Sequence, residues 1–312
     1  MAKRVTLLSG GVGGSKLAQG LYTILPIHTL SIIANCGDDI NLFGLRICPD
    51  LDILTYTLAG LVEESQGWGI KSDSHTALNV VKKLGGTDWF TLGDNDLGLH
   101  LWRTEQLKKG RGLTAVTATL SERVALNCNI LPMSNQYTPT MINTDKGEMH
   151  IQEYLVRYRT RPVVKGLRYA HAEKARPAPG LARAIELADV VIIGPSNPLI
   201  SIGPILAIPG IREALRKTKA RRIGVCPLVG GKALKGPTDR MMQQLGHESN
   251  PATVAGMYRD ILDEFVIDKS DEYYQEQVEA NGLICRMMPT IMNNMDAKQK
   301  LARELLKPPE RA

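Results

Sequence analysis

The sequence predicts an α/β protein, with a Rossmann-like three-layer core, a mainly parallel sheet and an inserted smaller α+β subdomain. Apolar strand-like segments alternate with helix-like segments near both ends of the chain, which is typical of a parallel sheet covered by helices. Between them, residues 129–158 read as short strands joined by a tight Thr-Asp-Lys-Gly turn at 144–147. We therefore expect a nucleotide- and metal-binding core at 1–110 and 178–312, with 111–177 inserted, as one structural unit overall.

The N-terminal part reads as strand, helix, strand. Residues 4–9 are expected to form a short apolar strand, and a run of glycines follows it. After the glycines, apolar side chains recur on one helix face at Leu17, Leu21, Ile24 and Leu25. Residues 28–35 are a second strand, and its continuous apolar side chains predict burial on both faces.

The same rhythm returns in the C-terminal part. Helical segments are expected at 179–189, 210–220 and 296–306, and strands at 190–194, 221–229 and 283–289. Asn250 followed by Pro251 predicts another helix start, because asparagine caps helices and proline suits their first position.

Composition narrows the classes of function. The 312 residues carry a net charge of +6, and residues 157–176 hold seven Lys/Arg against one Glu. Aromatic residues make up only 5%, and no nucleic-acid motif accompanies the basic stretch, so we expect no nucleic-acid partner. No apolar run approaches the roughly 18 residues of a membrane span, and no signal peptide is recognised. We expect a cytoplasmic protein whose five scattered cysteines are free thiols.

Glycines separate the first strand from the first helix, at Gly10, Gly11, Gly13 and Gly14. Glycines at such a turn let a phosphate approach the backbone, and the helix N-terminus attracts anions. Lys16 adds a positive charge. The spacing matches neither G-x-x-x-x-G-K-[ST] nor G-x-G-x-x-G, and strand two ends in Asn35 where a ribose-binding acid is needed. The pattern predicts phosphate binding but does not identify the nucleotide. The alternative is a tight turn between strand and helix that binds no ligand.

Acidic residues crowd into residues 35–54, at Asp38, Asp39, Asp50 and Asp52. Asp38 and Asp39 directly follow strand two, so these two are expected at the carboxyl edge of the sheet, where open α/β sheets bind ligands. Carboxylates beside a phosphate loop often hold Mg²⁺. The alternative is that aspartates form turns or cap helices, as Asp50 can after Pro49. We expect one or two of the four to bind the metal.

Three later stretches offer further candidate contacts to a substrate or metal, and the second and third are expected at the same edge. Residues 91–104 bring Asp94 and Asp96, with His100 and Arg103 on the helix that follows. The strand ending at Gly194 leads to Ser196 and Asn197, and the strand ending near 229 leads to four further residues, Gly230, Gly231, Lys232 and Lys235. Together these stretches suit a nucleoside diphosphate with a divalent metal. Structural turns, and a packed His100, are the alternatives.

Several motifs together resemble those of the CofD-type 2-phospho-L-lactate transferases of coenzyme F(420) biosynthesis. They are SGGVGGSKLAQGL, NCGDD, RICPDLD, WFTLGDNDLGLHLWRT, NILPMS, IIGPSNPLISIGPIL and GVCPLVGGKALKGP. The resemblance spans nearly the whole chain. It implies transfer of a 2-phospholactyl, enolpyruvyl phosphate or phosphoglyceryl group from a guanosine diphosphate ester to the deazaflavin FO, with release of GMP. It also implies Mg²⁺ dependence and a homodimer.

On this resemblance, Asp38, Asp39 and Asp50 are candidate metal ligands, and Asp52 and Asp50 are candidate catalytic carboxylates. Candidate substrate-binding residues are Gly10, Gly11, Gly13, Gly14, Lys16, Asp52, Thr91, Asp94, Ser196, Asn197, Gly230 and Lys232. Many relatives carry a basic residue near Thr91 or Asn95, and this chain has neither. The alternative is a non-catalytic regulator that resembles the gluconeogenesis-factor proteins, which bind nucleotide sugars. That reading accounts less well for PDLD and LGDNDLG together.

Overall fold

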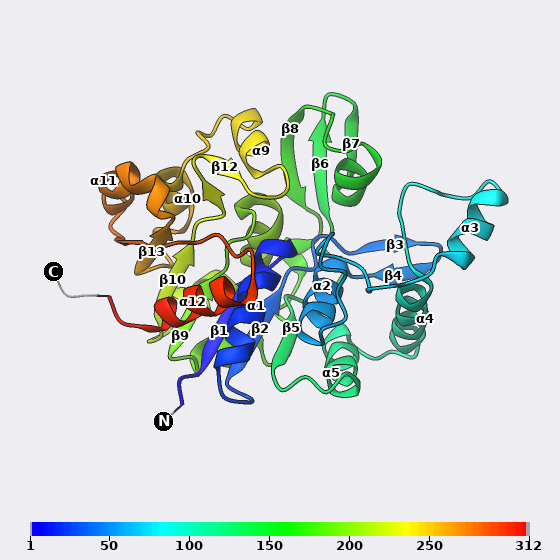
Figure 1. Ribbon diagram of the computed structural model, residues 1–312. Coiled ribbons are helices and arrows are strands. Elements are labelled where there is room, and N and C mark those ends of the chain that lie inside the picture. Colours follow the sequence, from blue (N-terminus) through cyan, green and yellow to red (C-terminus); the bar gives the residue numbers. More distant parts are fainter. Residues whose placement is uncertain (1, 310–312) are drawn as a thin grey trace.

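Seven parallel strands form the central sheet of the computed structural model, which describes residues 2–309 (Figure 1). Their order is β14-β13-β10-β9-β1-β2-β5, and every neighbouring pair is parallel. The strands are β1 (Val5–Ser9), β2 (Leu30–Ala34), β5 (Asn129–Pro132), β9 (Val190–Ile193), β10 (Arg221–Val225), β13 (Glu264–Ile267) and β14 (Ile284–Met287). The sheet confirms the predicted α/β class.

The central strands are apolar because both of their faces are covered. All five residues of β1 are buried, as are all four of β9. In the register, Val5 lies beside Leu30 of β2 and Val190 of β9, so branched apolar side chains continue across the sheet.

The sheet reverses its direction of growth between β1 and β9. From β1 the chain moves to β2 and then β5, whereas from β9 it moves the opposite way to β10, β13 and β14. With right-handed crossovers, the connecting helices of the two halves lie on opposite faces. A crevice opens at such a switch point, outside the carboxyl ends of the strands. The loops after β1 and β9 therefore face one space.

One helical layer centres on α1 (Gly11–Ile24), which packs along α12 (Met295–Leu306) and α2 (Pro49–Leu58) (Figure 1). Leu17 and Leu21 are fully buried, as their spacing predicts. The remaining helices are α3 (Thr76–Lys83), α4 (Asp94–Lys108), α5 (Leu113–Arg123), α6 (Leu181–Glu186), α7 (Gly203–Ala207), α8 (Ile211–Lys217), α9 (Thr238–Gln244), α10 (Pro251–Tyr258) and α11 (Gln275–Glu279), with the shorter turns η1 (Glu153–Arg157), η2 (Ala172–Lys174), η3 (Pro198–Ile202) and η4 (Lys269–Tyr274).

A separate antiparallel sheet stands beside the core, in the order β7-β6-β8. Its strands are β6 (Thr140–Thr144), β7 (Gly147–His150) and β8 (Val164–Tyr169), and β6 and β7 form the hairpin predicted at 144–147. Ile142, Met149 and Tyr154 belong to its own small hydrophobic cluster.

The predicted boundaries of the insertion need correction. Residues 111–177 include α5 and β5, but β5 pairs with β2 in the central sheet and α5 packs against β5. The extra sheet occupies only residues 140–169. Two short strand pairs also lie outside the central sheet: β3 (Ile40–Leu42) with β4 (Leu45–Ile47), and β11 (Leu228–Val229) with β12 (Lys232–Ala233).

The five cysteines are free thiols, and all but Cys285 are buried. Within residues 2–309, no single helix is long and apolar enough to cross a membrane. One bent pair, Pro198–Ala207 with Ile211–Lys217, passes the criteria of length and composition at a bend of 85°.

Candidate functional site

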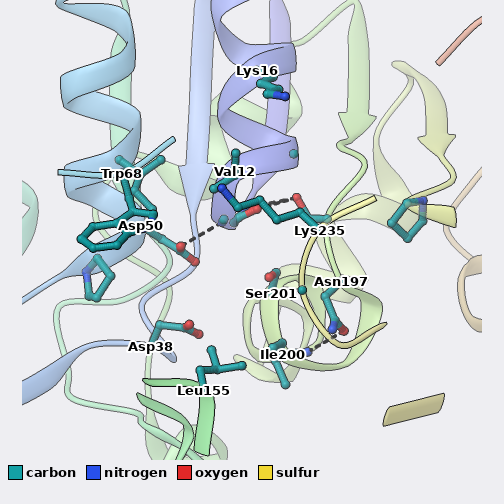
Figure 2. A pocket seen from close by; sticks show the side chains of 18 of the residues that line it. Val12, Lys16, Asp38, Asp50, Trp68, Leu155, Asn197, Ile200, Ser201 and Lys235 are labelled. Atoms are coloured by element: carbon teal, nitrogen blue, oxygen red, sulfur yellow. Dashed lines mark hydrogen bonds between the residues drawn. The ribbon is translucent and has the colours of Figure 1, made fainter. Parts of the chain in front are cut away.

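A cavity of about 570 Å³ lies at the switch point of the sheet. Its lining includes thirteen of the residues that the sequence pointed to: Gly10, Gly11, Gly13, Lys16, Asp38, Asp50, Asp52, Thr91, Asp96, His100, Ser196, Asn197 and Lys235. Figure 2 shows Asp38 and Asp50 on one side of this cavity, opposite Ser201 and Asn197. The aspartates follow β2 and the serines and asparagine follow β9, so the two halves of the sheet meet here.

Gly11, Gly13 and Gly14 lie in the first turn of α1, and Gly10 is the extended residue that precedes it. The helix begins at Gly11, whose φ of +63° favours glycine. At Gly13, a Cβ atom would lie 2.3 Å from the carbonyl oxygen of Pro195, so the loop after β9 can approach only because this residue is glycine. Gly14 packs against Ser9 and Ser196 and does not line the cavity.

Asn35 bridges two aspartates at the end of β2. Its Nδ2 group donates to Asp38 Oδ1 at 2.9 Å and to Asp50 Oδ2 at 2.8 Å. The orientation of the amide follows from Gly37, whose N–H donates to Asn35 Oδ1 at 2.7 Å. Asn35 occupies the position where dinucleotide-binding proteins place a ribose-binding acid, and here the amide binds the two carboxylates instead.

The outer oxygens of both carboxylates also have neutral donors. Gln152 Nε2 donates to Asp38 Oδ2 at 3.1 Å, and the N–H of Gly11 donates to Asp50 Oδ1 at 2.8 Å. The contact with Gly11 places Asp50 at the N-terminus of α1, where the helix dipole favours negative charge.

Burial raises the pKa of both aspartates. Asp38 and Asp50 are only 8% and 4% exposed. Burial, followed by the charge of Asp50, raises the pKa of Asp38 well above its usual range. Burial also raises the pKa of Asp50 to about 6, against the opposing effect of its hydrogen bonds from Asn35 and Gly11. Placing two carboxylates so close together in a buried site is unfavourable unless a positive charge balances them.

Asp52 has a different partner. The guanidinium of Arg103, on α4, contacts both oxygens of Asp52, and its Nη1 lies 3.0 Å from Oδ2. Burial alone would lower the pKa of Arg103, but the charge and hydrogen bonds of Asp52, together with neighbouring groups, raise it above its ordinary value. Asp52 thus sits in the cavity wall as one half of a buried ion pair.

His100 and Asp96 extend this pair along α4. His100 Nδ1 lies 3.2 Å from Arg103 Nη1, which can only donate, so Nδ1 accepts. His100 Nε2 lies 3.4 Å from Asp96 Oδ1, and Tyr56 Oη donates to the same oxygen at 2.5 Å. Ligand atoms of Asp52, Asp96 and His100 fall within 4.8 Å of one another, as in a metal site, but the Arg103 cation already contacts Asp52 and His100.

Asp39 does not line the cavity. Its carboxylate accepts hydrogen bonds from Arg46 Nη2 at 2.9 Å and from Cys48 Sγ at 3.1 Å. Burial raises the pKa of Asp39, and the charge of Arg46 opposes that rise. Because an internal cation balances Asp39, we withdraw it from the candidate metal ligands.

Three other candidates also lie outside the cavity lining. Asp94 accepts hydrogen bonds from the Ser74 hydroxyl and from the N–H groups of Thr76 and Ala77, so it caps the start of α3. The Gly230 N–H donates to Asp271, and Lys232 is exposed on β12. Of the two candidate lysines near the β11–β12 hairpin, Lys235 lines the cavity and Lys232 does not. Figure 2 shows the Lys235 side chain reaching towards Val12.

The chemistry of the donor set around Asp38 and Asp50 suits Mg²⁺. Both residues offer hard oxygen atoms, and the hydrogen-bond partners that hold them are neutral. A divalent cation would therefore balance the buried charge. The group around Asp52 fits a cation less well because Arg103 supplies the balancing charge.

Several side chains of this site were not selected from the sequence for any role in it, among them Asn35, Gln152 and Tyr56. Asn35 was noted only because it is not an acid. Its place directly after a buried strand, three residues before Asp38, was the available signal. Gln152 carries no such signal, because its approach to Asp38 depends on how the small sheet packs.

Comparison with known proteins adds to this geometry. The family model described as 2-phospho-L-lactate transferase CofD matches residues 5–302. The chain belongs to the CofD family. The family supports transferase activity, and the match includes every residue of the cavity wall.

Relatives within the family resemble the chain along nearly its whole length. A protein of Streptomyces griseus named phosphoenolpyruvate transferase is 41% identical over 97% of each chain. Proteins of the same name from Streptomyces coelicolor, at 38% identity over 97% of each chain, and Mycolicibacterium smegmatis, at 35% identity over 96% of this chain and 97% of the relative, are also similar. A solved structure of a UPF0052 family member from Bacillus halodurans superposes with a TM-score of 0.65 at 17% identity, covering 98% of this chain and 100% of the other. This likeness supports the fold.

Proposed function

We propose that this protein transfers a phospho-acid group from a guanosine diphosphate ester to the deazaflavin FO in coenzyme F(420) biosynthesis. The reaction releases GMP and forms a phosphodiester of the F(420)-0 type. One observation carries the proposal: a glycine-rich helix N-terminus, a bridged pair of carboxylates and an arginine-paired carboxylate line one cavity. The description of the family and the names of its members support the same class of reaction.

The transferred group is enolpyruvyl phosphate in this proposal. The support comes from relatives named phosphoenolpyruvate transferase, which are 35–41% identical and match nearly the whole chain. The 2-phospholactyl and phosphoglyceryl groups are the competing donors, and an assay that offers all three esters at equal concentration distinguishes them.

The diphosphate of the donor would bind at the start of α1. Backbone N–H groups and the positive end of the helix favour anions there, and Lys16 and Lys235 line the same part of the cavity. Asn197 would add a hydrogen bond, because its buried Nδ2 group finds no acceptor among the described residues. Ser196 lies beside it with its hydroxyl on Gly10.

Asp38 and Asp50 would hold Mg²⁺, which would neutralise charge on the diphosphate as the phosphoryl group is transferred. The protein contributes the positions of the two carboxylates. Gln152 and Asn35 hold Asp38, while Asn35 and Gly11 hold Asp50, so neither side chain has to reorganise when substrate enters.

The chemical step joins the ribityl hydroxyl of FO to the acid-bearing phosphorus. A new O–P bond forms there, the P–O bond to GMP breaks, and the hydroxyl proton leaves. We assign the orientation of that hydroxyl and the acceptance of its proton to Asp52. Its contacts with Arg103 fix the direction of the carboxylate, and proximity and alignment supply much of the rate gain in such transfers.

An apolar wall beside Asp52 suits the flat deazaflavin ring. Tyr56, Trp68 and Phe90 line this part of the cavity, and Leu155 and Val156 from the small sheet region complete it. Thr91 follows Phe90 at the same wall, where the family pattern places a ring contact. The wall would bind FO mainly by burial of aromatic surface.

The test is incubation of the protein with FO, Mg²⁺ and the guanylated acids, with GMP and the deazaflavin product followed by chromatography. We expect GMP to appear together with a more acidic deazaflavin, and neither to form without FO. Binding of nucleotide without any product would contradict the proposal.

We further propose, from its resemblance to the family, that the protein acts as a homodimer in the cytoplasm.

A further inference from the structure

The side chain of Asn35, at the end of β2, forms hydrogen bonds that link separate segments of the site. Its Nδ2 group makes its two shorter hydrogen bonds to carboxylates on different segments, Asp38 after β2 and Asp50 at the start of α2, and a longer one of 3.2 Å to the carbonyl oxygen of Ile200. The Gly37 N–H donates to Asn35 Oδ1, so an amide flipped by 180° would lose all four of these hydrogen bonds. The amide is therefore the shared link between these two carboxylates.

The backbone around Asn35 leaves it no freedom to move. Asn35 is fully buried, and its N–H donates to the carbonyl oxygen of Ser9 at 2.9 Å. Glycines make room for the cluster: a Cβ at Gly10 would lie 2.9 Å from Asp50 Oδ2 and 3.1 Å from Asn35 Cβ. A Cβ at Gly37 would lie 3.0 Å from Asn35 Oδ1. Close packing and hydrogen bonds therefore both restrain the amide.

From this geometry we infer that Asn35 is a positioning residue: it holds Asp38 and Asp50 at one separation and thereby sets which divalent cation the pair accepts. The inference rests on the metal-dependent function proposed above. Asn35 makes its contacts through the carboxylates and would not itself touch the cation.

Selectivity follows from the rigidity of the pair. Mg²⁺ needs oxygen ligands at about 2.0–2.1 Å in near-ideal geometry, whereas Ca²⁺ accepts about 2.3–2.6 Å and irregular coordination. A fixed pair of carboxylates favours the ion whose radius it matches. If the link is removed, the like charges separate, and the site adapts more easily to Ca²⁺ than to Mg²⁺.

The experiment measures cation binding without nucleotide or turnover. Mg²⁺, Mn²⁺ and Ca²⁺ are titrated by calorimetry into the wild-type protein, Asn35→Ala and Asn35→Ser. We expect the Mg²⁺ affinity of both variants to fall about 10–100-fold, as it does when the partners of metal ligands are removed. We expect a smaller fall in the affinity for Ca²⁺, so the ratio of Mg²⁺ affinity to Ca²⁺ affinity decreases in these variants.

Two further variants separate positioning from a general loss of structure. Asn41→Ala removes an exposed asparagine of β3 and is expected to match wild type for all three cations. Gln152→Leu removes a donor from Asp38 but keeps the bridge to Asp50, so affinity is expected to fall while the Mg²⁺-to-Ca²⁺ ratio is retained. Folding of each variant is checked by circular dichroism.

Nuclear magnetic resonance on ¹⁵N-asparagine-labelled wild-type protein covers the case in which both Asn35 variants misfold. Mg²⁺ is expected to shift the side-chain NH₂ resonances of Asn35 and to leave those of Asn41 in place. Two results would overturn the inference but not the proposed function. One is a folded Asn35 variant that keeps the wild-type ratio of Mg²⁺ to Ca²⁺ affinity, and the other is an Asn35 amide resonance that Mg²⁺ does not shift. A wild-type protein that binds none of the three cations would instead overturn the proposed metal-dependent function.

Discussion

Four aspartates that look alike in the sequence have different partners in the site. Asp39 faces Arg46 and Asp52 faces Arg103, so an internal cation balances each of them. Asp38 and Asp50 have only neutral hydrogen-bond donors among their described partners. The position of the nearest arginine therefore distinguishes the proposed metal ligands from the paired carboxylates.

This difference predicts opposite outcomes for two matched substitutions. Asp38→Asn removes a proposed ligand, so we expect Mg²⁺ binding and Mg²⁺-dependent turnover to be lost while the fold survives. Asp39→Asn leaves Arg46 buried without its partner, and breaking such a pair typically costs about 3–5 kcal/mol of stability. The Asp39 variant should still bind Mg²⁺ at a temperature where it remains folded. Calorimetric titration and chemical denaturation measure the two quantities, and equal Mg²⁺ affinities in the two variants would contradict this assignment.

The pair formed by Asp52 and Arg103 gives a second prediction. Arg103→Met leaves Asp52 buried and unpaired, so we expect a loss of about 3–5 kcal/mol in the free energy of unfolding. The double variant Asp52→Asn/Arg103→Met carries no unpaired charge and should recover much of that loss. Urea denaturation of both variants measures this. A double variant that is less stable than Arg103→Met would show that the pair does not act as a unit.

Sequence reasoning located the acidic residues but could not assign their roles. Asp38 was expected at the sheet edge and lines the cavity, as do the candidate carboxylates Asp50 and Asp52. Asp39 could not be separated from Asp38, because its contact with Arg46 exists only once β3 and β4 form a hairpin. Asp94 was selected as a substrate-binding residue because its role as a cap of α3 becomes visible only once the start of that helix is known.

At the scale of elements, α1 is shaped by the close approach of its neighbours. Gly13 admits the loop after β9, and Gly20 admits α12 on the other side of the helix: a Cβ at Gly20 would lie 2.4 Å from the carbonyl oxygen of Lys298. The glycine-rich sequence therefore serves packing as well as the proposed phosphate contact.

Two helical glycines make this claim testable. Gly20→Ala should destabilise the protein by about 1–3 kcal/mol, because the added methyl group collides with the backbone of α12. Gly98→Ala, in α4, meets no described heavy atom within 4 Å and should stabilise it by about 0.5–1 kcal/mol, since alanine is the better helix former. Thermal unfolding compares the two. A Gly20→Ala protein as stable as Gly98→Ala would contradict the proposed packing of α1 on α12.

Element prediction succeeded where the apolar pattern was long and continuous. The segments that became β1, β2, β9 and β10 were predicted from their apolar runs; β1 and β9 are buried throughout, and β2 and β10 over most of their length. β5 was assigned to the insertion because it precedes the antiparallel hairpin in the sequence. Its side-by-side pairing with β2 is a long-range contact, which no local pattern reports.

At the scale of the whole molecule, the cavity wall draws on both the central sheet and the segments outside it. The small sheet delivers Gln152 to Asp38 and His150 to the carbonyl oxygen of Asp39, at 3.1 and 3.0 Å. Phe90 and Trp68 come from the segment between α2 and α4. The alternation of elements predicted a parallel sheet with its ligand edge, whereas the reversal between β1 and β9 and these outer contributions required the folded chain.

We predict that the protein is a homodimer in solution, as its resemblance to the family implies. The chain has a mass of 34.2 kDa, so light scattering after size-exclusion chromatography should give about twice that mass. A mass that stays at one chain over a range of protein concentrations would contradict the prediction and leave the reaction proposal intact.

The account depends most on the transfer reaction itself, and product stoichiometry in one incubation tests it most directly. With FO, Mg²⁺ and the guanosine diphosphate ester of enolpyruvate, mass spectrometry should find one GMP for each new deazaflavin phosphodiester. Chelation of the metal, or the Asp38→Asn substitution, should abolish both products. If GMP forms without a deazaflavin phosphodiester, or if nucleotide binds and nothing is produced, the proposed function is wrong.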